Sequence, residues 1–162
     1  MPRSWIYRAA LICGFCAPLI AANAANAADG RRWIADKDSQ TAQLIYGTPE
    51  SDDMLLSLTC EKKTKTLWVF FAPSPAPDKA AAKMPITLSS EAGKAELTAT
   101  GTRSEMDDSY SLEAKTTMTP DIAKVLTGAK TVSVRVDKRK TDVPLDDVAL
   151  GVIGDLVQGC QK

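Results

Sequence analysis

Two acidic groups are the side chains from which chemistry could most readily be built. They are Glu50, Asp52 and Asp53, and Glu105, Asp107 and Asp108. Two carboxyl groups can act on a glycosidic bond as acid and base, and clustered carboxylate oxygens can hold calcium. Both groups fall between expected strands, where acidic residues commonly form solvated turns. We therefore interpret them first as turn residues, and we rank a carboxylate-dependent glycan hydrolase last among the functions considered.

Histidine is absent from the whole chain. Ser-His-Asp and Cys-His catalysis and the usual metallohydrolase ligand sets all need this side chain, so they are excluded. Phosphate-binding and dinucleotide-binding glycine motifs are also missing after the first 27 residues, as are the S-x-x-K and G-x-S-x-G patterns. The sequence predicts a protein that is not an enzyme, with no catalytic residue, no cofactor and no metal site.

Two basic runs could together form a docking patch for an anionic partner. They are Lys62, Lys63 and Lys65, and Lys138, Arg139 and Lys140. The patch would require two hairpin ends to converge. Charged residues at strand ends more often prevent edge pairing, which is the interpretation that we favour. Trp68, Phe70 and Phe71 could likewise line a ligand groove, although a strand that is apolar on both faces more often belongs to the core.

The elements that must position these residues follow an apparent leader. Residues 1–27 have the charged start, apolar middle and small-residue end of a cleaved secretory signal. Cleavage is expected after Ala27, with the site after Ala24 as the alternative. The apolar stretch is shorter than the roughly 20 residues of a membrane span and contains Pro18. We therefore expect a periplasmic or secreted protein with no membrane span after cleavage.

Residues 28–162 have the size of one domain, since about 100 to 150 residues is the commonest domain length. Removal of Arg3 and Arg8 with the leader reduces the 20 basic residues to 18, against 20 acidic residues, so the net charge becomes −2. A basic surface of the kind that binds nucleic acid or anionic membranes is not expected. The partner classes that remain are an envelope protein or cell-wall material.

Two cysteines remain outside the leader, Cys60 and Cys160. Alternation in the segment 54–60 places Met54, Leu56, Leu58 and Cys60 on one apolar face of a strand. Helical spacing near the end of the chain places Cys160 on a buried stripe. No C-x-x-C motif or histidine favours a redox pair or a zinc site, so we predict a disulfide between them. It would contribute up to about 4 kcal/mol by constraining the unfolded chain.

Turn residues and alternating apolar residues divide the remaining chain mostly into strands. The expected strands are 33–35, 41–46, 54–60, 67–72, 84–89, 95–100, 110–115 and, as the last, 131–136. A short helix is expected from Pro120 to Gly128, and a terminal helix from about Asp146 to Cys160. This order predicts a β-sandwich or a strongly bent antiparallel sheet, capped over its core by the C-terminal helix.

One layout of known proteins is similar. The segment Leu55–Cys60, a charged turn and Leu67–Phe71 resembles the central hairpin of type VI secretion-associated periplasmic accessory proteins. Pro120–Val136 and Pro144–Cys160 resemble their later helix, strand and terminal helix. The invasion-associated locus B family is similar in the tail but lacks this cysteine placement. The resemblance implies a periplasmic, β-rich accessory domain without a catalytic centre.

The leading functional hypothesis is a non-catalytic exported protein that binds another envelope component. It follows from the leader, the expected disulfide and the missing catalytic motifs. The alternative is an inhibitor of a lytic enzyme such as lysozyme, which would insert the acidic loop Glu105–Ser109 into the cleft of that enzyme.

Overall fold

The computed structural model describes residues 30–74, 76, 82–105 and 109–161. The predicted signal peptide therefore lies outside the described residues. Neither helix of the described part has the length and apolar character needed to cross a membrane. The elements are β1 (Arg32–Lys37), β2 (Thr41–Gly47), β3 (Met54–Glu61), β4 (Thr66–Phe71), β5 (Lys83–Ser90), β6 (Gly93–Arg103), β7 (Tyr110–Thr116), α1 (Pro120–Leu126), β8 (Thr131–Val136), β9 (Arg139–Pro144) and α2 (Asp147–Cys160).

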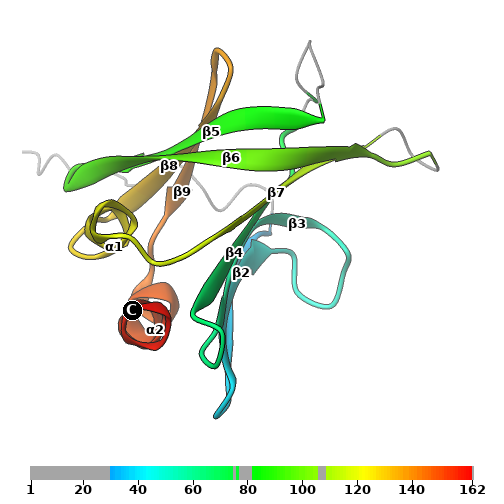
Figure 1. Ribbon diagram of the computed structural model, residues 1–162. Coiled ribbons are helices and arrows are strands. Elements are labelled where there is room, and N and C mark those ends of the chain that lie inside the picture. Colours follow the sequence, from blue (N-terminus) through cyan, green and yellow to red (C-terminus); the bar gives the residue numbers. More distant parts are fainter. Residues whose placement is uncertain (1–29, 75, 77–81, 106–108, 162) are drawn as a thin grey trace, which may run out of the picture.

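A single antiparallel sheet carries all nine of these strands and curls into a half-barrel (Figure 1). The bent sheet, one of the two predicted architectures, is therefore the one observed. Its strand order is β1-β2-β3-β4-β7-β6-β5-β8-β9. After β4 the chain passes over two strand positions to form β5, and β6 and β7 then fill the positions between β5 and β4. From β7 the chain continues through α1 to β8, which pairs with the other side of β5. The indole nitrogen of Trp33 donates a hydrogen bond to the carbonyl oxygen of Pro144, which links β1 to the end of β9.

The inner face of the sheet forms one apolar core with the two helices. Alternate residues of each strand point inward, as the period of two requires. Helix α1 packs on β5 and β6, and α2 packs on β1, β2 and β3. Representative inward side chains, all fully buried, are Leu44, Leu58, Val69, Ile86, Leu88 and Leu112. The curl of the sheet therefore encloses apolar residues from both of its halves.

The helices begin where the sequence predicts. The Thr119 hydroxyl accepts a hydrogen bond from the amide of Ile122, and Pro120 occupies the first turn of α1. At α2, the carboxylate of Asp146 accepts a hydrogen bond from the amide of Ala149 at 3.0 Å. These caps satisfy amide groups that have no partner inside the helix.

The predicted disulfide joins Cys60 of β3 to Cys160 in the last turn of α2, with both residues fully buried. It closes a sequence separation of 100 residues. The ammonium of Lys65 donates to the carbonyl oxygen of Gly159 at 2.9 Å, and so adds a positive charge at the helix C-terminus. The terminal helix is therefore attached to the β3–β4 hairpin by a covalent bond and a charged hydrogen bond.

The prediction that 131–136 is the last strand was wrong, because β9 follows it. Asp137 adopts a positive φ of 53° and makes the tight turn between them. Strand β9 lies at the edge of the sheet, and Val143 is its one fully buried residue. An edge strand with so little apolar character gives almost no periodic signal, and its basic residues suggested a strand end instead.

Candidate functional site

The outward face of β1–β4, which neither helix covers, carries apolar residues among polar ones such as Gln43, Ser57 and Thr59. Ile34 and Ile45 are directly opposite each other on β1 and β2, and Ile34 is 36% exposed. Trp68 and Phe70 point outward from β4 and are half-buried. Both helices lie on the other side of these strands (Figure 1). We call the outward residues Ile34, Ile45, Met54, Trp68 and Phe70 the apolar outer face.

Strand β4 was expected to be covered on both sides, and this expectation was wrong for one side. Phe71 is 1% exposed in the core, whereas Trp68 and Phe70 retain partial exposure on the outside. The Trp68 indole donates to Glu61 at 3.0 Å, and the ammonium of Lys115 lies 4.8 Å from its ring centroid. Trp68 is thus engaged by its neighbours, and Phe70 lines a hollow.

The outward residues of the other half of the sheet are polar. We call the following residues the polar outer face: Thr87, Lys94, Glu96, Ser133, Arg135, Lys140 and Asp142. Its ion pairs are internal, since Lys94 contacts Glu96 at 2.6 Å and Lys140 contacts Asp142 at 2.9 Å. A hollow of about 360 Å³ on this face is lined by hydroxyl and charged side chains.

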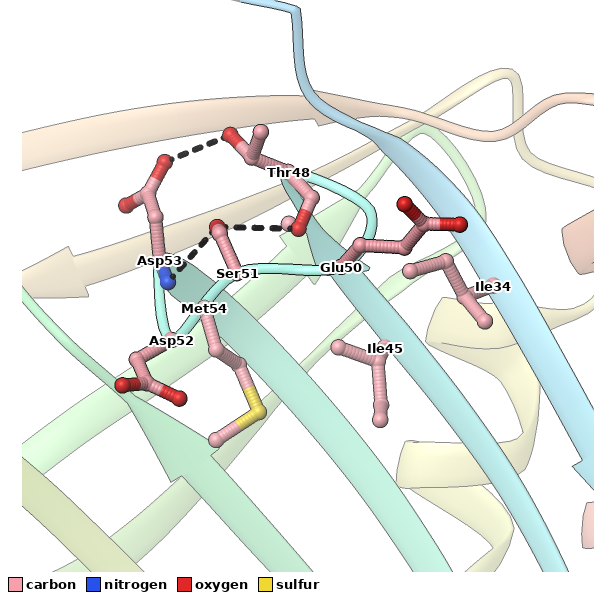
Figure 2. Close-up of a pocket in the computed structure, with 9 residues that line it drawn as sticks. Ile34, Ile45, Thr48, Glu50, Ser51, Asp52, Asp53 and Met54 are labelled. Carbon is pink, nitrogen blue, oxygen red and sulfur yellow. Dashed lines mark hydrogen bonds between the residues drawn. The ribbon is translucent and has the colours of Figure 1, made fainter.

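A hollow of about 460 Å³ opens over the apolar outer face at the β2–β3 loop. Its lining, which we call the acidic hollow, is Ile34, Ile45, Gly47, Thr48, Glu50, Ser51, Asp52, Asp53 and Met54. Figure 2 shows Ile45 between Ile34 and Met54, with Glu50 above Ile34 and Asp52 on the Met54 side. The first predicted acidic group therefore forms the rim of a hollow whose floor is aliphatic.

A close backbone approach and several hydrogen bonds fix the conformation of the β2–β3 loop. A side chain at Gly47 would place its Cβ 2.4 Å from the carbonyl oxygen of Asp53, which only glycine avoids. The Thr48 amide donates to the same carbonyl at 2.9 Å, and the Asp53 amide donates to the Ser51 hydroxyl at 3.1 Å. Glu50 has a positive φ of 58°, an uncommon conformation for a non-glycine residue. These contacts hold the rim residues in place.

Asp53 is the one member of the first acidic group with an ion pair among the described residues. Its two carboxylate oxygens accept hydrogen bonds from Arg31 at 2.9 and 3.0 Å, and one also accepts from the Thr48 hydroxyl at 2.8 Å. The Arg31 and Thr48 hydrogen bonds hold the pKa of Asp53 below its ordinary value. The carboxylate is therefore ionised at neutral pH and is poorly suited to act as a proton donor.

A second hollow lies beside the first and shares residues 52–54 with it. This Phe70 hollow has a volume of about 400 Å³ and is lined by Asp52, Asp53, Met54, Phe70, Ala72, Ser109, Tyr110 and Ser111. The end of the β6–β7 loop thus lies next to the β2–β3 loop. Within the second predicted acidic group, Glu105 is exposed, and Asp107 and Asp108 lie outside the described residues. Among the described residues, no three His, Cys, Asp or Glu side chains are grouped to hold a metal ion such as calcium.

The basic patch, which was the less favoured interpretation, does not form, because the two runs lie at opposite ends of the sheet (Figure 1). Lys62 donates to the carbonyl oxygen of Asp38, and Lys65 supports α2, at the end that carries the β3–β4 turn. Arg139 donates to the carbonyl oxygen of Ala76 at 2.7 Å at the other end. Lys63 and Lys138 are exposed. Lys62, Lys65 and Arg139 therefore serve separate local contacts.

The sequence did not predict that Ile34, Ile45 and Met54 form the floor of a hollow. Met54 was expected to point inward with Leu56, Leu58 and Cys60. A register shift between Tyr46 and Gly47 breaks the alternation at the start of β3, and Met54 lines the outer hollow instead. The available signal was Ile45, an apolar residue out of phase with the buried residues of β2.

The fold and the site together define a disulfide-linked, antiparallel half-barrel whose outer surface is partly apolar over β1–β4 and polar over β5, β6, β8 and β9. The chain matches no protein-family model, no curated protein and no solved structure. The site must therefore be interpreted from its own geometry.

Proposed function

We propose that this is an exported, non-catalytic protein of the periplasm that binds another component of the envelope through its apolar outer face. The contrast between the two outer faces of one sheet carries the proposal. Ile34, Ile45 and Met54 adjoin one another at one hollow, and partly exposed apolar residues with a polar rim commonly mark a protein interaction site. The buried disulfide, which typically persists in oxidising compartments, and the leader-like residues 1–27 support export.

Among the partner classes considered, a protein is favoured over cell-wall material. The floor of the acidic hollow is aliphatic and offers no hydrogen-bond partner to the hydroxyl groups that a glycan presents. The layout resemblance to periplasmic accessory proteins supports the same class. The inhibitor hypothesis depends on residues 105–109, of which 106–108 lie outside the described residues.

Site-specific photo-crosslinking in intact cells tests the proposal. A photoreactive residue replaces Ile34 on the apolar outer face in one variant and Glu96 on the polar outer face in the other, where both positions are exposed. We expect a discrete covalent adduct from position 34 and none from position 96. Adducts from position 96 alone, or from neither position, would reject the proposed contact surface.

A further inference from the structure

We propose that the acidic hollow binds a peptide segment of a partner protein in which an aliphatic side chain is flanked by lysine or arginine. This inference rests on the proposed function and specifies the chemistry of the partner. The floor of the hollow is apolar and its rim is negatively charged, and each property selects a different feature of the bound segment.

The floor provides the apolar part of the recognition. Ile34, Ile45 and Met54 lie side by side in Figure 2 and leave part of their surface exposed to solvent. A hollow of about 460 Å³ falls in the size range of binding pockets, roughly 300 to 1,000 Å³. An aliphatic side chain seated there would remove apolar surface from water on both partners, which is the dominant favourable contribution to most associations.

The rim determines the charge of the occupant. The lining holds three carboxylates, Glu50, Asp52 and Asp53, and no basic side chain. Of the two neighbouring arginines, Arg31 pairs with Asp53, and Arg32 lies opposite Gly47 on β1. The ion pairs of the described residues engage Asp53 but not Glu50 or Asp52. Such a field attracts a cationic segment and repels an anionic one. Nucleic acid, phosphate and anionic membrane surfaces therefore fit this hollow poorly.

The hydrogen-bonded loop lowers the cost of binding. Gly47 and the contacts of Thr48, Ser51 and Asp53 fix the rim before a partner arrives. A rigid site loses less conformational freedom when it is occupied. The Phe70 hollow adjoins the acidic hollow across residues 52–54, so a segment longer than a few residues can place a second apolar side chain there.

A defined peptide probe tests this inference on the oxidised protein purified from the periplasm. The probe is a fluorescein-labelled octapeptide of alternating lysine and leucine, and its binding is followed by fluorescence anisotropy. Matched Glu–Leu and Lys–Ser octapeptides separate the contributions of charge and apolar side chains. We expect the Lys–Leu peptide to bind at least about tenfold more tightly than either matched peptide, which corresponds to about 1.4 kcal/mol.

Variants assign the binding to the hollow. Glu50→Gln combined with Asp52→Asn should weaken Lys–Leu binding at least about tenfold, and Ile45→Ser should weaken it by a similar factor. Glu96→Gln on the polar outer face is the matched control and should change nothing. Circular dichroism and thermal unfolding confirm that each variant is folded, and the exposed charge variants keep the test valid if Ile45→Ser does not fold.

Three outcomes would overturn the inference. The first is equal binding of the Lys–Ser and Lys–Leu peptides, and the second is an equal effect of Glu96→Gln and of the rim variants on peptide binding. The third is concentration-dependent dimerisation that the rim variants abolish, which would assign the hollow to a second copy of the chain. If the Lys–Leu peptide does not bind while position 34 still crosslinks in cells, the peptide inference fails and the proposed function stands. Loss of the position 34 adduct rejects the proposed function itself.

Discussion

The two halves of the sheet have similar inner faces and different outer faces. Inside, β2–β4 and β5–β8 contribute the same kind of fully buried aliphatic residue to one core. Outside, the first half presents Ile34, Ile45 and Phe70 among polar residues such as Gln43, Ser57 and Thr59, whereas the second half presents paired charges and hydroxyl groups. Folding requires only the inner residues to be apolar. The apolar outer face is therefore better explained by binding than by stability.

The disulfide offers the largest test of this comparison, because it holds α2 beneath the first half only. Replacing both Cys60 and Cys160 with alanine should lower the free energy of unfolding by about 2 to 5 kcal/mol. Chemical denaturation measures the loss. Hydrogen exchange on the variant should rise more in β1–β3 than in β5 and β6. Equal acceleration in both halves would show that the bond does not act locally.

The inner faces should respond alike to truncation. Leu58→Ala in the first half and Leu88→Ala in the second should each lower the free energy of unfolding by about 2 to 5 kcal/mol, since both side chains are fully buried. Thermal and denaturant unfolding provide the measurement. A cost below about 1 kcal/mol at either site would contradict its place in a shared core.

A matched glycine pair tests the loop that forms the rim. Gly47→Ala should destabilise the protein by about 1 to 3 kcal/mol, because the new Cβ would collide with the Asp53 carbonyl oxygen. Gly154→Ala on α2 has open space and should instead stabilise it by about 0.5 to 1 kcal/mol. Unfolding of both variants shows the signs, and unchanged stability of Gly47→Ala would disprove the close approach.

Lowering the pH should destabilise the protein through one carboxylate near each outer face. Arg31 and Thr48 lower the pKa of Asp53, and the Ser133 hydroxyl with Lys140 lowers the pKa of Asp142. A lowered folded-state pKa stabilises the protein above the unfolded value of about 3.9, and this contribution disappears as the pH falls through the lower folded value.

Both carboxylates are about half exposed, so each contribution is at most about 1 kcal/mol. Asp53→Asn and Asp142→Asn should therefore destabilise the protein at pH 6 and much less at pH 2, as measured by denaturant unfolding. An equal loss at both pH values would mean that the charge of the carboxylate is not responsible.

Much of the architecture could be predicted from the sequence because local chemistry determines it. Alternation located the first eight strands, Thr119 and Pro120 marked the start of α1, and the burial pattern paired Cys60 with Cys160. The edge strand β9 was missed because a single buried residue, Val143, gives no period.

The hollow could not be predicted in the same way. The register shift at Gly47 depends on pairing between β2 and β3, and it reverses the direction of Met54. The exposure of Phe70 depends on where the helices pack, because a strand that is apolar on both sides looks the same whether or not a layer covers it. Tertiary arrangement, and not local pattern, created the apolar outer face.

Substitutions on the two outer faces should change stability least. Ile45→Ser and Thr87→Ser are each expected to shift the free energy of unfolding by about 1 kcal/mol or less, since neither side chain is fully buried. Denaturant unfolding of the two variants provides the comparison. A loss of more than about 3 kcal/mol for Ile45→Ser would make the apolar outer face part of the stabilising core.

Hydroxyl-radical labelling tests the central claim most directly, because it compares the two outer faces of the unmodified protein in a single experiment. Mass spectrometry would give the ratio of oxidation at Met54 to oxidation at Pro85, an exposed outward residue of β5 in the second half of the sheet, for purified protein and for protein in intact cells. The account predicts that this ratio falls several-fold in cells, because a partner covers the acidic hollow and leaves the polar outer face open. An unchanged or increased ratio would contradict it.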